Sequence, residues 1–240
     1  MERREALGTL LAGAASTALA GTRTDPGRLF EEAPAPKAGG HAIKPLPFDP
    51  KKLDGLSEKL LVSHHENNYA GAVKNLNKVE AELARLPKDA APFLVSSLRE
   101  RELNFANSLV LHELYFANLG GGGKPSGGLA AALAEAFGSM GAWEESFRAL
   151  GSSLGGGSGW TVLALNFHTG QLNLAWAGGH TNAMAFGAPL LVMDMFEHAY
   201  QMDYGAAAGK YIDAFFRNVA WEEVHRRFEA AGRMAKALKG

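Results

Sequence analysis

A glycine-rich stretch, Gly120 to Gly128 (GGGGKPSGG), divides the 240-residue chain into two parts with different hydrophobic periodicity. Glycine and proline interrupt helices and strands, so this stretch is the best candidate for a domain boundary. Before it, apolar residues recur at helical intervals over residues 56–86 and 92–119, and Pro87 separates the two runs. Two long helices joined by a short connection predict an antiparallel helical hairpin, which we place in a domain of residues 46–120.

After the glycine-rich stretch the pattern changes from purely helical to mixed. Five runs predict elements, namely helices over residues 129–137 and 142–150 and strands over residues 160–167, 171–178 and 188–194. The remainder of the chain is helical again. We therefore predict an α+β fold, in which the long N-terminal helical hairpin is followed by a domain of residues 125–240 with helices and a small sheet of about three strands.

The first twenty residues differ from the rest of the chain. Arg3 and Arg4 precede an apolar run of Ala, Leu and Gly, and Ala18-Leu19-Ala20 resembles a cleavage site. We interpret residues 1–20 as an export signal, with the paired arginines typical of the twin-arginine type, and residues 21–45 as a linker. The apolar run is shorter than the roughly 20 residues of a membrane span. The prediction is export to a periplasmic or extracellular location, and the alternative is a disordered or helical tail.

Composition limits the chemistry and the partners. The formal net charge is -1 and the sequence pI is about 6.7, whereas nucleic-acid binding and attachment to an anionic membrane usually need a strong basic excess. We therefore predict neither nucleic-acid nor membrane binding. The chain has no cysteine, so any metal must be held by imidazole and carboxylate groups.

The histidines differ in their surroundings. Asp194 and His198 are four residues apart after an apolar run, where one helical turn would bring their side chains together. That spacing also fits a helix-capping Asp beside a structural His. His112 lies in the apolar run SLVLHELYF, where an unpaired imidazole would be costly to bury. His64 and His65 are neighbours in the first helix, and only one of them can share a face with a given partner. Three other histidines, His41, His168 and His225, are interpreted as solvated.

Four segments with the same order and spacing resemble the iron/manganese superoxide dismutase family over most of residues 44–235. DMFEHAY is similar to that family's D-x-W-E-H-A-Y signature, and GSGWTVL to its G-S-G-W-x-W-L. KPLPFDP resembles its L-P-Y segment, and HHENNYAGAVKNLN aligns without a gap to its H-H-x-x-H-H-x-x-Y-V-x-N-L-N helix. The resemblance implies a two-helix N-terminal domain and an α+β C-terminal domain with a three-stranded antiparallel sheet.

The resemblance also implies the chemistry. Its metal ligands map onto His64, His112, Asp194 and His198, which would hold one Fe or Mn ion per subunit and leave a fifth position for solvent. The implied reaction converts superoxide to dioxygen and hydrogen peroxide. The same ligands bind either metal, so we expect Fe or Mn. His65 is then expected to be a packing or surface residue.

The chain departs from the family at the entrance to the site. The gateway His and Tyr become Asn68 and Ala72, and Gln201 replaces the Tyr that bonds the gateway His across the dimer interface. An Asn and a Gln amide could form a substitute polar pair.

Two aromatic positions of the motifs also differ. Phe196 and Val162 each replace a family Trp, and the basic residue after the signature is missing, although Lys210 could serve. These changes affect proton supply and anion steering more than metal binding.

Further residues are expected near the metal or at the entrance to its site. The family places a Gln or His against the metal-bound solvent, and the candidates here are Ser108 and His180, of which His180 is preferred. Trp160 belongs to the glycine motif, and Asn68 occupies the gateway position. Tyr69 could reach the substrate funnel in place of the missing gateway Tyr. The catalytic candidates are therefore His180, Asn68, Tyr69 and Trp160.

Glu197 predicts an assembly. In the family this acid bonds the metal-ligating His of the partner subunit, so the resemblance implies a homodimer with Glu197 at the interface; the alternative is a solvated helix acid. The predicted function is superoxide dismutase. Two alternatives are a family member that binds metal without dismutase activity and another non-haem iron enzyme, because His and carboxylate sets with open positions also serve oxygenases.

Overall fold

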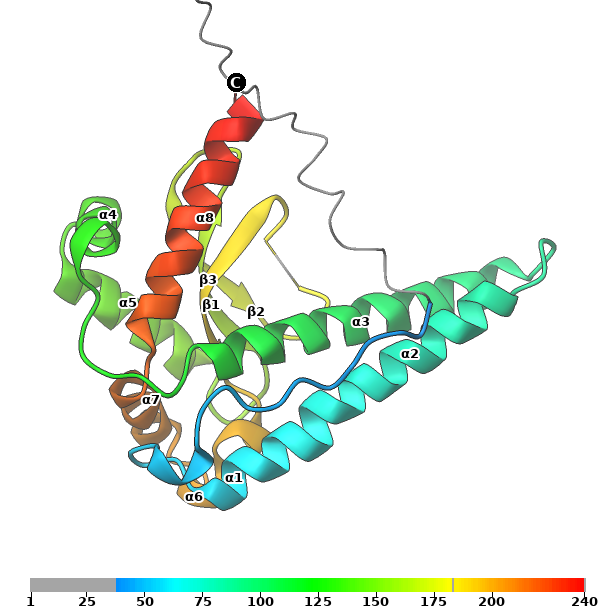
Figure 1. Cartoon of the computed structure of the whole chain (residues 1–240), viewed down its shortest axis with the longest axis horizontal. Coiled ribbons are helices and arrows are strands. Elements are labelled where there is room, and N and C mark those ends of the chain that lie inside the picture. The colour runs from blue at the N-terminus through cyan, green and yellow to red at the C-terminus, as the bar shows by residue number, and fades with distance from the viewer. Residues whose placement is uncertain (1–37, 183, 240) are drawn as a thin grey trace, which may run out of the picture. The chain divides into compact units, whose positions relative to one another are not determined.

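The structure of the chain is a computed structural model that describes residues 38–182 and 184–239 (Figure 1). The predicted export signal, residues 1–20, and most of the predicted linker lie outside the described residues. Among the residues that are described, no helix has both the length and the apolar character needed to cross a bilayer.

The N-terminal half is a long helical hairpin. It consists of α1 (Glu58–Ser63), a π-helical segment (His64–Tyr69) and α2 (Ala70–Arg85), followed by α3 (Pro92–Ala117). The Ser57 hydroxyl accepts a hydrogen bond from the Leu60 amide at 3.1 Å and so caps the first turn of α1. At the other end of the arm, Leu86 is extended before Pro87, and Pro92 occupies the first turn of α3, where its missing N–H costs nothing. The predicted pair of long helices is confirmed.

The periodicity suggested that the first arm of the hairpin is a single α-helix, but the arm contains a π-helical segment. An α-helix that buries Leu60 and His64 would next bury residue 68, but the buried residue is Tyr69. The extra residue in the π turn moves the buried stripe by one position, and α2 then continues it with Val73 and Leu76. The segment therefore turns His64 and Tyr69 to the same interior.

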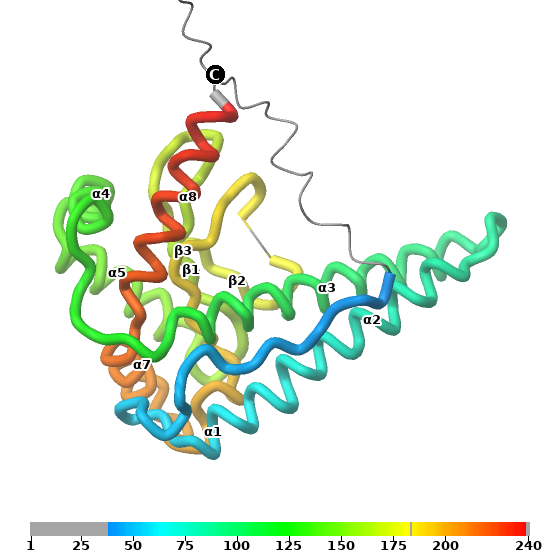
Figure 2. The backbone as a smooth tube through the Cα atoms, in the orientation of Figure 1, coloured from blue at the N-terminus to red at the C-terminus, as the bar shows by residue number. Residues whose placement is uncertain are grey.

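An extended strap, residues 38–48, lies along the hairpin and appears in blue in Figure 2. The backbone of His41 exchanges two hydrogen bonds with the side chain of Asn77 in α2, each 2.9 Å long. Glu80, one turn further along α2, accepts from the Gly39 amide at 2.7 Å and lies 2.9 Å from the His41 ring. The described end of the predicted linker is thus bonded to α2.

The C-terminal half contains a three-stranded antiparallel sheet and helices. After α4 (Gly127–Phe137) and α5 (Met140–Ser153) come β1 (Trp160–Asn166), β2 (Leu172–Ala177) and β3 (Gly187–Asp194), in the spatial order β2-β1-β3. The register of β1 against β3 pairs Trp160 with Asp194. Gly159, at φ +145°, admits the carbonyl of Ala177 where a Cβ would clash at 2.4 Å. The predicted α+β fold and its three strands are confirmed.

The last part of the chain is helical, in several pieces. A 3₁₀ turn (Glu197–Ala199) and α6 (Gln201–Tyr204) precede α7 (Ala208–Arg217) and α8 (Trp221–Lys239), which runs beside β3 (Figure 1). The break between α7 and α8 pairs Val219 with Leu119 and Ala220 with Gly122, so it ties the end of α3 to this region.

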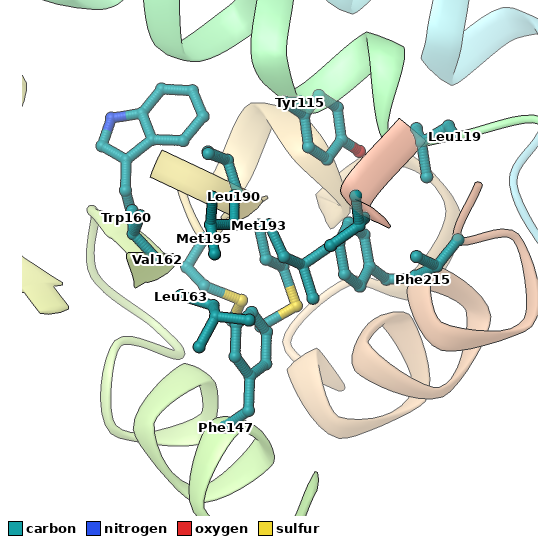
Figure 3. Packing of buried hydrophobic residues seen from close by; sticks show 14 of the residues in the cluster. Tyr115, Leu119, Phe147, Trp160, Val162, Leu163, Leu190, Met193, Met195 and Phe215 are labelled. Carbon is teal, nitrogen blue, oxygen red and sulfur yellow. The ribbon is translucent and has the colours of Figure 1, made fainter. Parts of the chain in front are cut away.

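The core lies on both faces of the sheet. In Figure 3, Phe147 of α5 meets Met193 and Met195 on one side, while Trp160 points away from them. All four side chains are fully buried. The face that carries Trp160 and Val162 packs against α3, and α3 also contacts β3. This packing brings His112 of α3 over the end of β3.

Candidate metal centre

Four side chains from distant parts of the chain meet at the end of β3. His64, His112, Asp194 and His198 each offer one ligand atom, and these atoms all lie within 4.8 Å of one another. The Nε2 atoms of His64 and His198 lie 3.1 and 3.2 Å from Asp194 Oδ2, and that of His112 lies 3.7 Å from it. The structure therefore brings together the four residues that the sequence predicted as ligands.

The donor set fits a metal ion. Two ligand atoms of one ion, each bonded at about 2.1 Å, are separated by about 3.0 to 4.2 Å depending on their angle. The three Nε2 to Oδ2 distances fall in that range. Nε2 of His64 and Nε2 of His112 are buried and make no hydrogen bond within the described chain. Buried polar atoms without partners are costly, and a cation among them would satisfy both.

The tautomer of His112 follows from its position in α3. Its Nδ1 lies 2.7 Å from the carbonyl oxygen of Ser108, one turn earlier. A carbonyl only accepts hydrogen bonds, so Nδ1 carries the proton and Nε2 presents its lone pair to the centre. Ser108 was one candidate for contact with the solvent ligand, but it acts through this carbonyl, and its side chain is buried. A backbone partner of this kind fixes the orientation of a metal-binding histidine.

Asp194 is held by two hydrogen-bond donors from neighbouring segments. Its Oδ1 accepts from the Phe196 amide at 2.9 Å, and its carbonyl oxygen accepts from the Tyr211 hydroxyl of α7 at 2.7 Å. The four-residue spacing suggested that Asp194 and His198 would meet on one face of a helix, but they do not. They meet across a tight turn in which Asp194 ends the strand and the following 3₁₀ turn carries His198.

Burial governs the protonation of the inner ligands. Burial lowers the pKa of His112 to about 3, assisted by repulsion from His64, and burial also lowers the pKa of His64. For Asp194 burial alone would raise the pKa, but the charge and hydrogen bond of His198, together with the nearby His64, hold it well below the usual range. The site therefore holds His64 and His112 as neutral imidazoles and Asp194 as an ionised carboxylate, which are the forms that bind metal.

His180 lies at the outer side of the centre, between two aromatic side chains. Trp160 Nε1 donates to His180 Nδ1 at 3.0 Å, and the His180 ring stacks on Phe196 with centroids 4.7 Å apart. Because an indole N–H only donates, Nδ1 must be the acceptor and Nε2 carries the hydrogen of the neutral ring. Burial also lowers the pKa of His180, which favours this neutral form. Phe196 stacks equally on His198, with centroids 5.3 Å apart.

Tyr69 is buried beside the centre, and its hydroxyl faces the strap. It donates to Glu113 at 3.0 Å and accepts from the Lys44 amide at 3.0 Å, while its ring centroid lies 6.4 Å from that of His112. Burial raises the pKa of Tyr69 to about 12. Asn68 is half-buried on the π-helical segment, and Ala72 is buried in α2.

The other predicted residues lie further out. His65 is half-buried, and its ring lies 2.7 Å from the Lys44 carbonyl, which agrees with a packing role. Glu197 and Gln201 are exposed next to His198, and Lys210 is exposed on α7. Their predicted roles at an interface and in anion steering stay predictions.

Two supporting residues were not found from the sequence. Tyr211 reaches Asp194 from α7, and Asn107 of α3 donates to the backbone carbonyl of His180 at 2.7 Å. The second contact joins residues 73 positions apart. Neither residue lies in a motif, so only the tertiary packing reveals them.

Comparison with known proteins agrees with this geometry. Residues 125–227 match the C-terminal domain of iron/manganese superoxide dismutases. The chain is 48% identical over 194 residues to a protein named superoxide dismutase (Fe) from Cupriavidus metallidurans, covering 80% of this chain and 98% of the relative. It is 34% identical over 196 residues to superoxide dismutase (Mn) 2 of Haloferax volcanii, covering 80% and 96% of the two chains. A superoxide dismutase (Fe) from Aquifex aeolicus is 34% identical over 212 residues, with 84% and 98% covered.

The matched length, the fold and the cluster of three histidines and one aspartate point to the same conclusion. The chain belongs to the iron/manganese superoxide dismutase family, it is an oxidoreductase acting on superoxide, and its cofactor is Fe or Mn.

Proposed function

We propose that the chain dismutates superoxide at the centre formed by His64, His112, Asp194 and His198, with these four side chains as ligands of one Fe or Mn ion per subunit. The observation that carries the proposal is the arrangement of three Nε2 atoms around a single carboxylate oxygen, two of them buried and without a hydrogen bond in the described chain. Such a set has little structural purpose without a cation.

The bound ion would supply one-electron chemistry, by which two superoxide ions and two protons become dioxygen and hydrogen peroxide. The protein's own contribution begins with charge. Imidazoles bind a metal in their neutral form, so one carboxylate among four ligands would leave a divalent or trivalent ion with net positive charge, which would attract an anionic substrate. The low pKa of Asp194 keeps that carboxylate ionised throughout the ordinary pH range.

The outer residues would control orientation and protons. In the tautomer that Trp160 imposes, His180 keeps Nε2–H available as a hydrogen-bond donor. Phe196 covers the rings of His180 and His198 and so limits the access of water. We assign supporting roles to Asn68 at the entrance and to Tyr69 behind His112.

Metal reconstitution tests the proposal. The metal-free protein would be loaded with Fe or with Mn, and metal content and superoxide turnover would be measured on the same samples. We expect about one ion per subunit and turnover that depends on it, and the variant His168→Gln, in an exposed turn, should behave like wild type. Full metal loading without turnover would instead support an inactive, metal-binding member.

We further propose a homodimer with Glu197 at its interface. Glu197 and Gln201 are exposed beside the half-buried His198, and the Glu197 carboxylate makes no bond to another described residue. A partner subunit could supply that bond. Sedimentation velocity at micromolar concentration should give the mass of a dimer, and Glu197→Gln should weaken it while Glu222→Gln, an exposed acid of α8, should not. A monomer for the wild-type protein would exclude the assembly.

We also propose export through residues 1–20. The sequence features that support the proposal are Arg3 and Arg4 before the apolar run and Ala18-Leu19-Ala20 at its end. Fractionation of the native host should find the protein outside the cytoplasm, with its mature N-terminus after Ala20. Replacing Arg3 and Arg4 with lysine should keep it inside if the twin-arginine route is used. A cytoplasmic protein that still begins at Met1 would refute the proposal.

A further inference from the structure

The loop between β2 and β3, residues 178–186, carries His180. It begins with Gly178 and Gly179, which have no side chains to pack, and it ends at Phe186, a non-glycine residue with φ of +57°. Such a positive φ is strained for a residue with a Cβ, and it persists only where the surroundings hold it. The position of His180 therefore depends on specific contacts.

The described residues of the loop border a void on the side that faces the sheet. A cavity of about 120 Å³ lies there, lined by Asn107, Val162, Trp176, Asn182 and Met184 among others. Tight packing normally fixes the position of a segment, and a void removes those contacts on one side. Packing therefore contributes less to the position of the loop on this side.

Hydrogen bonds from two rigid elements reach His180 instead. Asn107 Nδ2 of α3 donates to the His180 carbonyl at 2.7 Å, and Trp160 Nε1 of β1 donates to the His180 ring at 3.0 Å. The first bond fixes the backbone and the second fixes the ring. Asn107 lies in the same helix as His112, five residues earlier, so the bond ties His180 to the element that carries a ligand.

We propose that Asn107 is a positioning residue that holds the backbone of His180 at the metal centre, so that the Trp160 bond can orient the ring. The inference rests on the proposed role of His180 and extends it to a residue outside every motif. Without the Asn107 bond the loop can lift from α3, and a misplacement of about 1 Å at a reacting centre can cost about 100-fold in rate.

A double-mutant cycle in the metal-loaded protein tests the proposal. The variants are Asn107→Leu, which keeps the size but removes the donor; His180→Ala; the combination of both; and Asn104→Leu as the control. Asn104 is one turn earlier in α3, and its side chain makes no hydrogen bond to another described residue. The readouts are metal content, kcat, and the affinity of the iron-loaded protein for azide, a small anion whose binding is followed by absorbance.

We expect Asn107→Leu to keep its metal, to lose about tenfold in kcat and to bind azide about two- to tenfold more weakly, since a hydrogen-bonding partner is misplaced. In the His180→Ala background the same change should have an effect below about twofold, because its route of action is gone. Asn104→Leu should match wild type. Asn107→Ala repeats the measurement should the leucine fail to pack.

The other outcomes separate the two ideas. If His180→Ala is impaired while Asn107→Leu and Asn107→Ala behave like wild type, the positioning role is wrong and the role of His180 stands. If Asn107→Leu is equally harmful with and without His180, Asn107 acts by another route and the inference is wrong. If His180→Ala is unimpaired, the proposed role of His180 fails, and the inference fails with it.

Discussion

The metal centre has two halves that differ in how they are built. The inner half consists of His64, His112 and Asp194, whose side chains are at most 1% exposed. They come from the π-helical segment, the middle of α3 and the end of β3, all parts of the core. The outer half consists of His198, with a side chain 26% exposed, together with His180 and Phe196 on connecting segments.

The difference separates binding from turnover. The inner residues are held by packing and by bonds to helices and strands, and they supply three of the four proposed ligands. The outer half contains a position where the chain departs from the family pattern, since Phe196 replaces a Trp. Metal retention should depend mainly on the inner half, and rate and anion affinity mainly on the outer half.

Asp194→Asn gives the largest effect, because it attacks the inner half directly. The amide keeps the shape but removes the only negative charge among the four ligand side chains. We expect metal content to fall about tenfold or more and turnover to fall beyond the roughly 100-fold that the loss of an outer-shell partner can cost. Elemental analysis and a dismutase assay measure both, with Asp89→Asn, an exposed turn residue, as the control. A variant that retained its ion would break the distinction between the halves.

Acid should destabilise the metal-free protein through the same inner half. Burial lowers the pKa of His64 and His112 in the folded state, the latter to about 3, whereas the unfolded chain protonates them near 6.5. The unfolded state thus binds more protons between these values, and stability is lost as pH falls through 6.5 toward 3. For His112 the cost should be about 1.4 kcal/mol per pH unit over that window, and His64 adds to it in the same direction.

Urea unfolding of the metal-free protein at pH 7, 6 and 5 measures that slope. His168→Gln removes an exposed histidine and should leave the slope unchanged. Stability that is constant from pH 7 to pH 5 would show that the inner histidines are not held neutral.

Local patterns in the sequence predicted the elements of the inner half. Pro87 and Pro92 bracket the turn of the hairpin, and the apolar neighbours of His112 place it inside α3. At the π-helical segment the buried stripe steps by five residues, from His64 to Tyr69, a spacing that helical periodicity alone does not predict. A step of five is a readable mark of a π turn.

The supports of the outer half could not be predicted in the same way. Asn107 and His180 are 73 residues apart, and the hydroxyl of Tyr211 reaches the Asp194 carbonyl from α7. These bonds depend on how α3 and α7 dock on the sheet, which no local period encodes. The meeting of Asp194 and His198 was predicted, but through a helix instead of the turn that forms it.

Phe196→Leu should sharpen the comparison from the outer side. The leucine keeps most of the volume but loses the flat ring that stacks on His180 and His198. Aromatic pairs contribute about 0.5 to 1.5 kcal/mol beyond their buried area, so we expect kcat to fall by about two- to tenfold. Metal content should stay near wild type. Phe93→Leu, at an exposed position of α3, serves as the control. A Phe196→Leu variant that lost its metal would place Phe196 functionally with the inner half.

Tyr69→Phe should have the smallest effect and tests where the inner half ends. The change removes the hydroxyl that donates to Glu113 and accepts from the Lys44 amide, but leaves the ring beside His112. The loss of a hydrogen bond predicts a stability decrease of about 0.5 to 1.5 kcal/mol, measured by urea unfolding. If Tyr69 also supports turnover, kcat should fall by about twofold with metal content unchanged, since the lower end of that energy range, about 0.5 kcal/mol, corresponds to about twofold in rate. Tyr204 lies on α6, and its hydroxyl donates to the Gly55 carbonyl. Tyr204→Phe removes that hydroxyl and should lower stability without changing kcat. An unchanged kcat in Tyr69→Phe would restrict the residue to holding the strap on α3, and the functional inner half would then consist of the ligands alone.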